Sequence, residues 1–309
     1  MKLLQRLLRR LGWACVTLFG TTLVTFVIIC NIHGDPARMM AGPKADPKTL
    51  AAIRHEFGFD RPPAQRYAIY LNQVVHGNWG ISTFTRKPVL PTIMERFPAT
   101  AELALGGLAF YLLIGMPLGL WTARHKNQWQ DRITLVVGIL IISMPIFYLA
   151  RMLQFGLCYK LRILPVAGIG GFSHLLLPAF TLGLGGGIYY SRLLHASLVD
   201  VLAQDYVRFA RARGLSESRV LGRHVLRNAL IPVATQLGMD VAGLLGGVIF
   251  TENVFSWPGI GTLAVNAIFQ LDVAMILGTV LFSAILVVAA NIIVDLLYPL
   301  LDPRIERSV

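Results

Sequence analysis

The residue pair with the best spacing for catalysis is Ser191 and His195. Side chains four residues apart share one face of a helix, so a nucleophile could lie beside a base there. No GxSxG elbow surrounds the serine, however, and no orienting acid is in place. The sequence also lacks a GxxxxGK(S/T) phosphate loop and an HExxH motif. We therefore expect no catalytic residue, no metal site, no cofactor and no enzymatic activity, and we interpret the pair as polar residues at the end of a helix.

The basic segment 192–228 could instead bind a partner. A helix beginning at Asp205 is expected to end at Gly214, because glycine often ends helices in the left-handed conformation. Ser216 can then cap a second helix with Glu217 in its first turn, where the helix dipole favours an acid. Such a pair of helices can dock into a groove on a soluble partner, or it can lie on anionic lipid.

Composition decides the class of protein. Only 14% of the 309 residues are charged, 55% are hydrophobic, and the mean hydropathy is +0.62. Soluble domains average about 25% charged residues, so this chain is expected to lie in a lipid bilayer. The three cysteines form no CxxC pair, which excludes a disulfide framework or a zinc ribbon. The net charge of +12 fits the basic cytoplasmic loops of membrane proteins better than nucleic-acid binding, which we do not expect.

Six segments are apolar enough to cross a bilayer, each with at most one charged residue. A transmembrane helix needs about 20 mostly apolar residues. The segments are 11–32, 99–121, 133–157, 175–191, 229–250 and 274–298, of which the fourth is the shortest. The first is too long for a signal peptide, so we expect it to be retained. The predicted fold class is all-α, a polytopic membrane protein with six transmembrane helices.

The distribution of basic residues predicts the orientation of the chain. They crowd 1–10, 124–132 and 192–227, and the positive-inside rule assigns such segments to the cytoplasm. Both termini and 192–228 are therefore expected to be cytoplasmic, whereas the long segment 33–98 is expected to be external.

Segment 33–98 is too long to lack structure. Asp46-Pro47 is typical of a helix start, and an amphipathic stripe from Ala64 to Val75 predicts a second helix. We expect the two helices to form a cap on the outer face. This cap is either a packing lid or a surface in contact with a ligand.

Four charged residues lie inside predicted spans, and two of them, Glu102 and Asp295, are near span ends, where their side chains can reach the interface. The other two are the candidates. Asp240 is surrounded by four glycines between 238 and 247, and Arg151 lies within the third span. Ionisable side chains within membrane segments are functional candidates by default. Asp240 and Arg151 are therefore expected either to line a pathway or to bridge to a partner subunit. A glycine run at 183–187 indicates either a loose or a closely packed fourth span, and small residues at helix contacts favour close packing.

Short motifs spread over almost the whole chain resemble one family of membrane proteins. They are Gly34-Asp35-Pro36-Ala37-Arg38, Trp79-Gly80-Ile81-Ser82, Arg86-Lys87-Pro88-Val89, Pro98-Ala99-Thr100-Ala101-Glu102-Leu103, Ser143-Met144-Pro145, Leu164-Pro165, 205–216, 227–232, 252–261 and Asp302-Pro303-Arg304-Ile305. Any one of these motifs is weak evidence, but together, in this order on six spans, they are specific. The chain resembles permease subunits of ATP-binding-cassette (ABC) importers, in the dipeptide, oligopeptide and nickel permease family and its glutathione branch.

The resemblance implies that 192–228 is a coupling hairpin that seats in an ATPase. The residues assigned to this coupling element are Ala210, Gly214, Leu215, Ser216 and Glu217. Ala210 and Gly214 match the Ala-x-x-x-Gly kernel of the family motif. Arg208 stands where the motif usually has an acid, and Phe209 replaces an alanine.

The resemblance also implies partners and a substrate class. The partners are a second homologous permease, two ATP-binding subunits that hydrolyse the ATP, and an external solute-binding protein. The substrate is a small peptide, namely a dipeptide, an oligopeptide or glutathione, with a nickel or metal chelate as the alternative. A six-span secondary transporter or channel is the alternative of another class.

The expected organisation has four parts. Residues 1–32 form a cytoplasmic tail and the first span, and 33–98 form the external region. Residues 99–298 form the transmembrane domain with five spans and the coupling segment, and 299–309 form a cytoplasmic tail. The protein is expected in the inner membrane of a bacterium.

Overall fold

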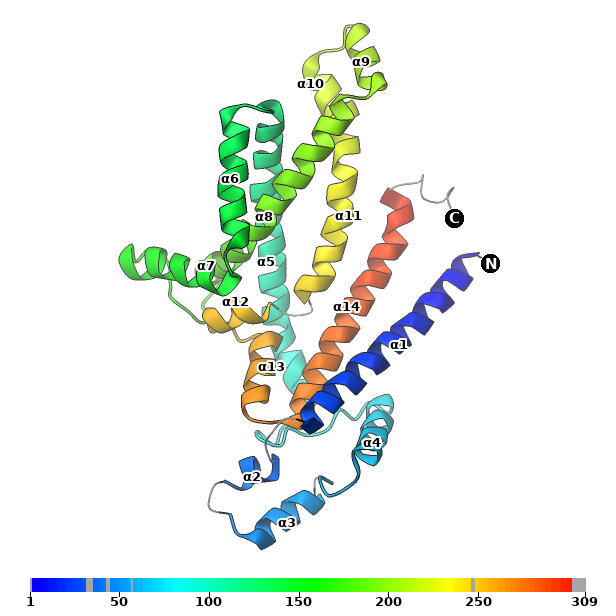
Figure 1. The fold of residues 1–309 in the computed structure, drawn as a ribbon, viewed down its shortest axis with the longest axis vertical. Helices are drawn as coiled ribbons and strands as arrows, with labels where there is room; N and C mark the ends of the chain where they lie inside the picture. The colour runs from blue at the N-terminus through cyan, green and yellow to red at the C-terminus, as the bar shows by residue number, and fades with distance from the viewer. Residues whose placement is uncertain (1, 32–35, 43–44, 57, 246–247, 302–309) are drawn as a thin grey trace. The chain divides into compact units, whose positions relative to one another are not determined.

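The computed structural model describes residues 2–31, 36–42, 45–56, 58–245 and 248–301. Within these ranges the chain forms α-helices, two π-helical segments and one isolated β-bridge (Figure 1). The all-α prediction is therefore confirmed. The motif at 302–305 lies outside the described residues, as do Gly34, Asp35, Gly246 and Gly247.

Five helical stretches in the described part of the chain are long and apolar enough to cross a membrane. They are Arg9–Asn31 within α1 (Lys2–Asn31), α5 (Val89–Arg124), α8 (Phe172–Leu202), Glu217–Leu245 ending in α11 (Leu226–Leu245), and Val273–Val294 within α14 (Val273–Leu301). A bent pair of helices makes a sixth if it is counted as one span. Because each stretch satisfies its backbone hydrogen bonds internally, it can exist in hydrocarbon.

The third predicted span is not one straight helix. α6 (Trp129–Ser143) is followed, after a bend of 104°, by α7 (Ile146–Leu153) and the π-helical η1 (Gln154–Lys160). Pro145 has no N–H to continue the helix, and it forces Met144 into the extended conformation, with φ −78° and ψ 131°. The predicted span 133–157 is therefore present as a bent pair of helices rather than as one straight helix.

The fourth and fifth predicted spans have different ends from those expected. α8 is 31 residues long, so the prediction that this span is the shortest is wrong. A helix can continue past the apolar segment, because residues such as Arg192 and His195 are compatible with helix outside hydrocarbon. α11 ends at Leu245, and a separate helix, α12 (Ile249–Val254), follows.

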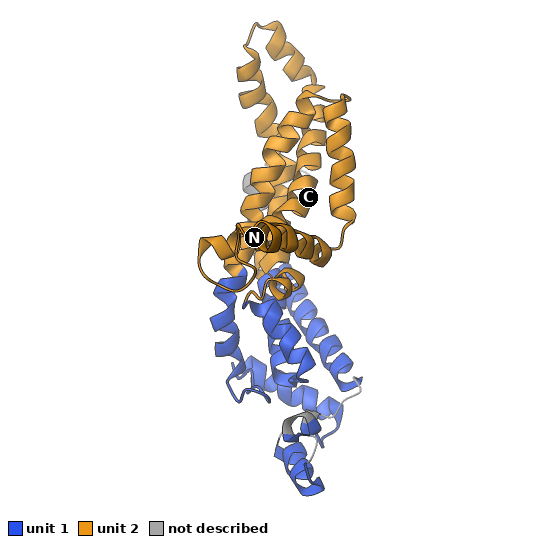
Figure 2. Ribbon diagram, turned by 90° about the vertical axis from the view of Figure 1, so that its left-hand side faces the viewer, with its two compact units in different colours: residues 1–100, 258–288 blue, residues 101–257, 289–309 orange. Residues whose placement is uncertain are grey.

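Unit 1 consists of residues 1–100 and 258–288 (blue in Figure 2). It contains α1, α2 (Pro36–Ala41), α3 (Pro47–Glu56), α4 (Pro63–Val75) and α13 (Ile260–Phe269), with the first parts of α5 and α14. The two helices predicted within 33–98 are present as α3 and α4. Asp46 accepts a hydrogen bond from the Thr49 N–H at 3.3 Å, so it caps α3 as predicted.

A buried carboxylate fixes a loop in unit 1. Asp272 is 2% exposed and precedes α14. It accepts hydrogen bonds from the Ser82 hydroxyl, from both the N–H and the hydroxyl of Thr83 at 3.2 Å, and from the Met275 N–H at 3.2 Å. We call this arrangement the Asp272 clamp. It holds the Trp79-Gly80-Ile81-Ser82 motif against the start of α14, and within the described part of the chain Asp272 forms no ion pair.

Unit 2 consists of residues 101–257 and 289–309 (orange in Figure 2). In it, α5 and α8 approach each other closely. A Cβ added at Gly183 would lie 2.2 Å from the Phe110 Cβ, and one added at Gly115 would lie 2.6 Å from the Tyr190 Cβ. Only glycine fits at such contacts. Gly183, Gly186 and Gly187 confirm the prediction of close packing, whereas an added Cβ at Gly185 would have no atom within 4 Å.

The motif at 252–257 packs the interior of unit 2. Glu252, Phe255 and Trp257 are at most 2% exposed, and the Trp257 N–H donates to the Glu252 carbonyl at 2.8 Å. Phe255 packs against Ala150 of α7 and Leu177 of α8. This motif therefore stabilises the corner between α12 and the bent span.

Candidate functional site

The basic segment 192–228 forms a hairpin at one end of unit 2. α9 (Asp205–Ala212), α10 (Glu217–Arg219) and the π-helical η2 (Val220–Val225) follow the end of α8 and lead into α11 (Figure 1). The expected helix–turn–helix is therefore present. Its second helix begins as a single α-helical turn, and α-helical geometry resumes only at Leu226.

Gly214 makes the turn between the two helices. Its φ is +76°, in the left-handed region that glycine adopts without a steric penalty. The prediction that Gly214 ends the first helix is confirmed. Ser216 occupies the N-cap position of α10, but its hydroxyl makes no capping hydrogen bond, so the predicted side-chain cap is wrong. That hydroxyl lies 3.4 Å from the Ser218 hydroxyl instead.

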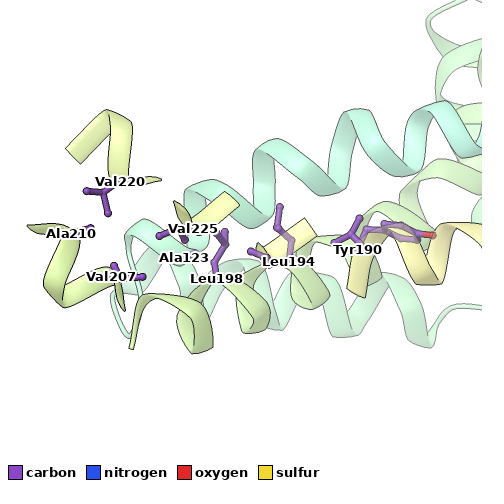
Figure 3. Packing of buried hydrophobic residues seen from close by; sticks show 10 residues of the cluster. Ala123, Tyr190, Leu194, Leu198, Val207, Ala210, Val220 and Val225 are labelled. Carbon is purple, nitrogen blue, oxygen red and sulfur yellow. The ribbon is translucent and has the colours of Figure 1, made fainter. Parts of the chain in front are cut away.

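The inner face of the hairpin is apolar. Val207 and Ala210 of α9 pack in one cluster with Val220 and Val225 of η2, and this cluster continues along α8 to Leu198 (Figure 3). Ala210 is 8% exposed, so this residue of the predicted coupling kernel supports the hairpin from within. Leu215 is partly buried against the same cluster. Its apolar side chain therefore ties the turn to the cluster.

The outer face of the hairpin is formed by different residues. Phe209 is 69% exposed, and the neighbouring Arg208 and Arg213 are also exposed. Arg211 and Glu217 join the two helices across the turn, with 2.8 Å between Nε and Oε1. An exposed phenylalanine among arginines is a chemical feature that a protein groove can bind. The sequence interpretation treats Phe209 only as a departure from the family motif, because the inward and outward faces of so short a helix are not known before the fold.

Asp240 lies where α11 meets α8. Its carboxylate accepts hydrogen bonds from the Tyr190 hydroxyl of α8 at 2.8 Å and from Gln236 at 3.0 Å, and the residue is half-buried. The Tyr111 ring of α5 lies 5.6 Å from the Tyr190 ring, centroid to centroid. An ionisable group in a membrane segment thus has protein partners, as such groups require. Sequence spacing gives no sign of Tyr190, which is 50 positions away.

Arg151 is placed apart from this arrangement. It is exposed on α7 and donates to the Gln154 side chain at 2.8 Å. Among the hydrogen bonds and ion pairs of the described residues, none joins Arg151 to Asp240. The two predicted pathway or interface residues are therefore not brought together within this chain.

The Ser191 and His195 pair does not form a hydrogen bond. The buried Ser191 hydroxyl has no hydrogen-bond partner among the described residues, whereas His195 Nδ1 lies 3.2 Å from the Thr122 hydroxyl. An acid does lie near the histidine, contrary to the sequence interpretation. Asp131 Oδ1 is 3.8 Å from His195 Nδ1, but it forms its shorter contact, 2.9 Å, with Arg192. These side chains connect the end of α5 and the start of α6 to the last third of α8.

Known structures show the same fold. The chain is similar to the structure described as inward facing conformations of the MetNI methionine ABC transporter, in its CY5 SeMet soak crystal form. The TM-score is 0.58 and the identity 16%, covering 69% of this chain and 98% of that chain. The native crystal form gives a TM-score of 0.53 and 14% identity, over 68% and 96% of the two chains. Over about two thirds of its length, the chain therefore shares the fold of these structures.

The family is defined by sequence. Residues 115–307 match the family described as binding-protein-dependent transport system inner membrane component, and 3–104 match its N-terminal counterpart. The chain belongs to this family of transport permeases. It is a multi-pass inner-membrane protein, and permeases of this kind work in a complex with ATP-binding subunits and a substrate-binding protein.

Curated relatives match from end to end. The chain is 36% identical over 304 residues to the glutathione transport system permease protein GsiC of Escherichia coli (strain K12). The alignment covers 98% of this chain and 99% of the relative. The same protein of Shigella dysenteriae serotype 1 (strain Sd197) gives the same values.

Proposed function

We propose that this chain is one of two permease subunits in an ATP-driven importer of small peptides, with glutathione as the first candidate substrate. The observation that carries this proposal is the 36% identity to a glutathione permease over 98% of the chain. A nickel chelate, the alternative suggested by the wider family, has no support from a particular residue cluster. Among the described residues, no three His, Cys, Asp or Glu side chains are grouped as metal ligands would be.

The proposed complex contains a second homologous permease, two ATP-binding subunits and a solute-binding protein. The hairpin formed by segment 192–228 docks into an ATP-binding subunit with its outer face, on which Phe209 is exposed. Closure of the ATP-binding subunits then moves the hairpin, and the spans attached to it alternate between two orientations. Both termini and the hairpin face the cytoplasm, and α3 and α4 lie outside.

Asp240 has one of two roles in this proposal. It lines the translocation pathway, or it lies at the interface with the second permease. Its hydrogen bond to Tyr190 supports either role, because both keep the carboxylate away from lipid. Arg151 is exposed on α7 and is proposed as a contact for the second permease.

Uptake in cells tests the substrate and the energy source. Cells that express this chain with its genetically adjacent importer subunits are given labelled glutathione, a labelled dipeptide or ⁶³Ni²⁺, with and without ATP depletion. We expect peptide uptake that stops when ATP is depleted. Peptide uptake that continues without ATP would favour a secondary transporter or a channel, and uptake of nickel alone would favour the metal alternative.

Two valine substitutions test the coupling hairpin. A β-branched residue at Gly214 opposes the positive φ of the turn, so Gly214→Val should misdirect the hairpin while the chain still inserts in the membrane. The matched control is Gly156→Val, since an added Cβ at Gly156 has no atom within 4 Å and this glycine does not have a positive φ. We expect uptake and substrate-stimulated ATP hydrolysis to be lost only in Gly214→Val. Normal activity in both variants would place the coupling element elsewhere.

Labelling of single cysteines tests the orientation. The natural cysteines at 15, 30 and 158 are first replaced, and cysteine is then introduced at Asn72, Ser216 or Ser308. A membrane-impermeant maleimide should label position 72 in intact cells, but not 216 or 308. Labelling of position 308 from outside would overturn the proposed topology.

A further inference from the structure

Unit 1 contains a cleft that the proposed coupling mechanism does not use. Its volume is about 490 Å³, and its walls come from α1, α4, the start of α14 and the loops after α3 and α4. Binding sites for small molecules have volumes of about 300–1,000 Å³. Phe59, Tyr70 and Trp79 give the cleft aromatic walls, and Gln73 and Asn78 give it amide groups.

Two arginines supply the positive charge of the cleft. The Arg66 guanidinium lies over the rings of Phe26 and Phe59, 5.7 and 5.3 Å from their centroids. Such cation–π contacts hold a guanidinium in place while its N–H groups stay available at the edge. Arg61 also lines the cleft and is exposed. Among the described residues, neither arginine forms an ion pair with a carboxylate.

The acid in the cleft is already engaged. Glu56 Oε1 lies 3.8 Å from Arg86, which is not a lining residue, so its charge is offset from outside the cleft. The charged side chains that line the cleft therefore have a net positive charge. This charge, beside aromatic walls, favours an anion that also carries apolar groups.

Tyr70 adds a neutral donor. Its hydroxyl is buried and has no hydrogen-bond partner among the described residues, whereas the hydroxyl of Tyr67, one turn earlier on α4, bonds to Thr22 at 3.0 Å. Burial raises the pKa of Tyr70, so the phenol keeps its proton and can donate. A buried donor without a partner costs free energy unless a ligand satisfies it.

We propose that this cleft binds a small peptide through a free carboxylate. The carboxylate lies between Arg61 and Arg66, the Tyr70 hydroxyl donates to the peptide, and the aromatic walls contact its apolar side chains. That the peptide is the transported solute rests on the proposed function. The binding itself depends only on residues of unit 1.

The test compares a dipeptide with its amide. The full-length chain is reconstituted in lipid nanodiscs and titrated with Gly-Phe or Gly-Phe-amide into the millimolar range, and binding is followed by saturation-transfer NMR. The amide keeps the size of the ligand but removes its negative charge. We expect the free acid to bind at least about tenfold more tightly, since charge-assisted hydrogen bonds are roughly twice as strong as neutral ones.

Arginine variants locate the binding. Arg61→Gln and Arg66→Gln should each reduce the affinity for Gly-Phe to about that for the amide, with the amide unaffected. Arg61→Gln is the safer variant for folding, because Arg61 is exposed and does not stack between rings. The matched control is Arg54→Gln on α3, which removes the same charge outside the cleft and should bind like the unmodified chain.

The outcomes separate this proposal from the proposed function. Three results would contradict peptide binding in the cleft. They are equal affinity for the acid and the amide, binding of neither ligand, and unchanged affinity for Gly-Phe in both cleft variants. The expected binding pattern could be found although the complete importer takes up no peptide. That result would support peptide binding in the cleft and contradict peptide import. If the importer takes up peptide but the chain binds Gly-Phe and Gly-Phe-amide equally, only the proposed binding in the cleft is contradicted.

Discussion

The hairpin formed by segment 192–228 and the Asp272 clamp both shape a loop beside a membrane helix, but different forces stabilise them. The hairpin depends on small and apolar side chains that pack along one face, with a single exposed ion pair across the turn. The clamp depends on one buried carboxylate that accepts hydrogen bonds from three residues. Packing energy is spread over many contacts, whereas the hydrogen bonds of the clamp all depend on one side chain.

This difference predicts how each region responds to substitution. Loss of one apolar contact leaves the others in place. Loss of Asp272 would leave several buried donors without a partner at once, and each such group costs about 1–3 kcal/mol. The clamp should therefore fail completely when one residue is changed, and the hairpin should weaken gradually.

The largest effect is expected for Asp272→Ala. The free energy of unfolding should fall by about 3 kcal/mol or more, because the donors of Ser82, Thr83 and Met275 lose their acceptor. Thermal unfolding in detergent, followed by size-exclusion chromatography, measures this change. Asp200→Ala is the control, since Asp200 is exposed near the end of α8. Equal melting temperatures for the two variants would show that the clamp does not stabilise the protein.

A smaller effect is expected for Ala210→Leu. Ala210 is 8% exposed and packs with Val220 and Val225. A larger side chain therefore overpacks the hairpin and lowers its stability by about 1–3 kcal/mol. Limited proteolysis should cut the hairpin faster while the melting temperature of the whole chain changes little. Ala212→Leu is the control, because Ala212 is exposed on the same helix. Equal cleavage rates in both variants would contradict the packing role of Ala210.

Glu217→Gln should have a still smaller effect. The Arg211 and Glu217 side chains are 43% and 62% exposed, and exposed ion pairs contribute about 0–1 kcal/mol. The rate of hairpin cleavage should rise slightly at low salt and match that of the unmodified chain at high salt. A large rise in the cleavage rate at low salt that disappears at high salt would mean that the ion pair, rather than packing, holds the turn, because salt screens exposed charges.

The smallest effect on stability is expected for Phe209→Ala. Phe209 is 69% exposed, so its truncation should change the free energy of unfolding by less than about 0.5 kcal/mol. Association with the ATP-binding subunit should nevertheless weaken, as measured by co-purification of the complex. Unchanged association would remove Phe209 from the proposed docking surface.

The same comparison shows which features can be predicted from sequence. Gly214 is predictable because a glycine that ends a helix is a local signal, and so are α3 and α4, whose starts are marked by prolines. Asp272 is not predictable, since its partners Ser82 and Thr83 are about 190 positions away and no periodicity connects them. The inward direction of Ala210 depends on η2, whose π-helical geometry has no sequence signature.

The spans show a second limit. Hydropathy locates the membrane segments, but it does not distinguish a straight helix from one that bends at Met144-Pro145. It also does not show where α8 ends, because a helix can extend beyond the apolar stretch. The contact between Asp240 and Tyr190 depends on the pairing of α8 with α11, which no local pattern encodes.

The bend after α6 has a consequence for the surrounding membrane. α6 has 15 residues and therefore rises only about 22 Å, less than the ~30 Å thickness of a typical hydrocarbon core. Because the chain turns by 104° at its end, α7 adds little to this length. A short hydrophobic helix is matched by a locally thinner bilayer. We therefore expect the lipid annulus beside α6 to be compressed, and the protein to be most stable in lipids with short acyl chains.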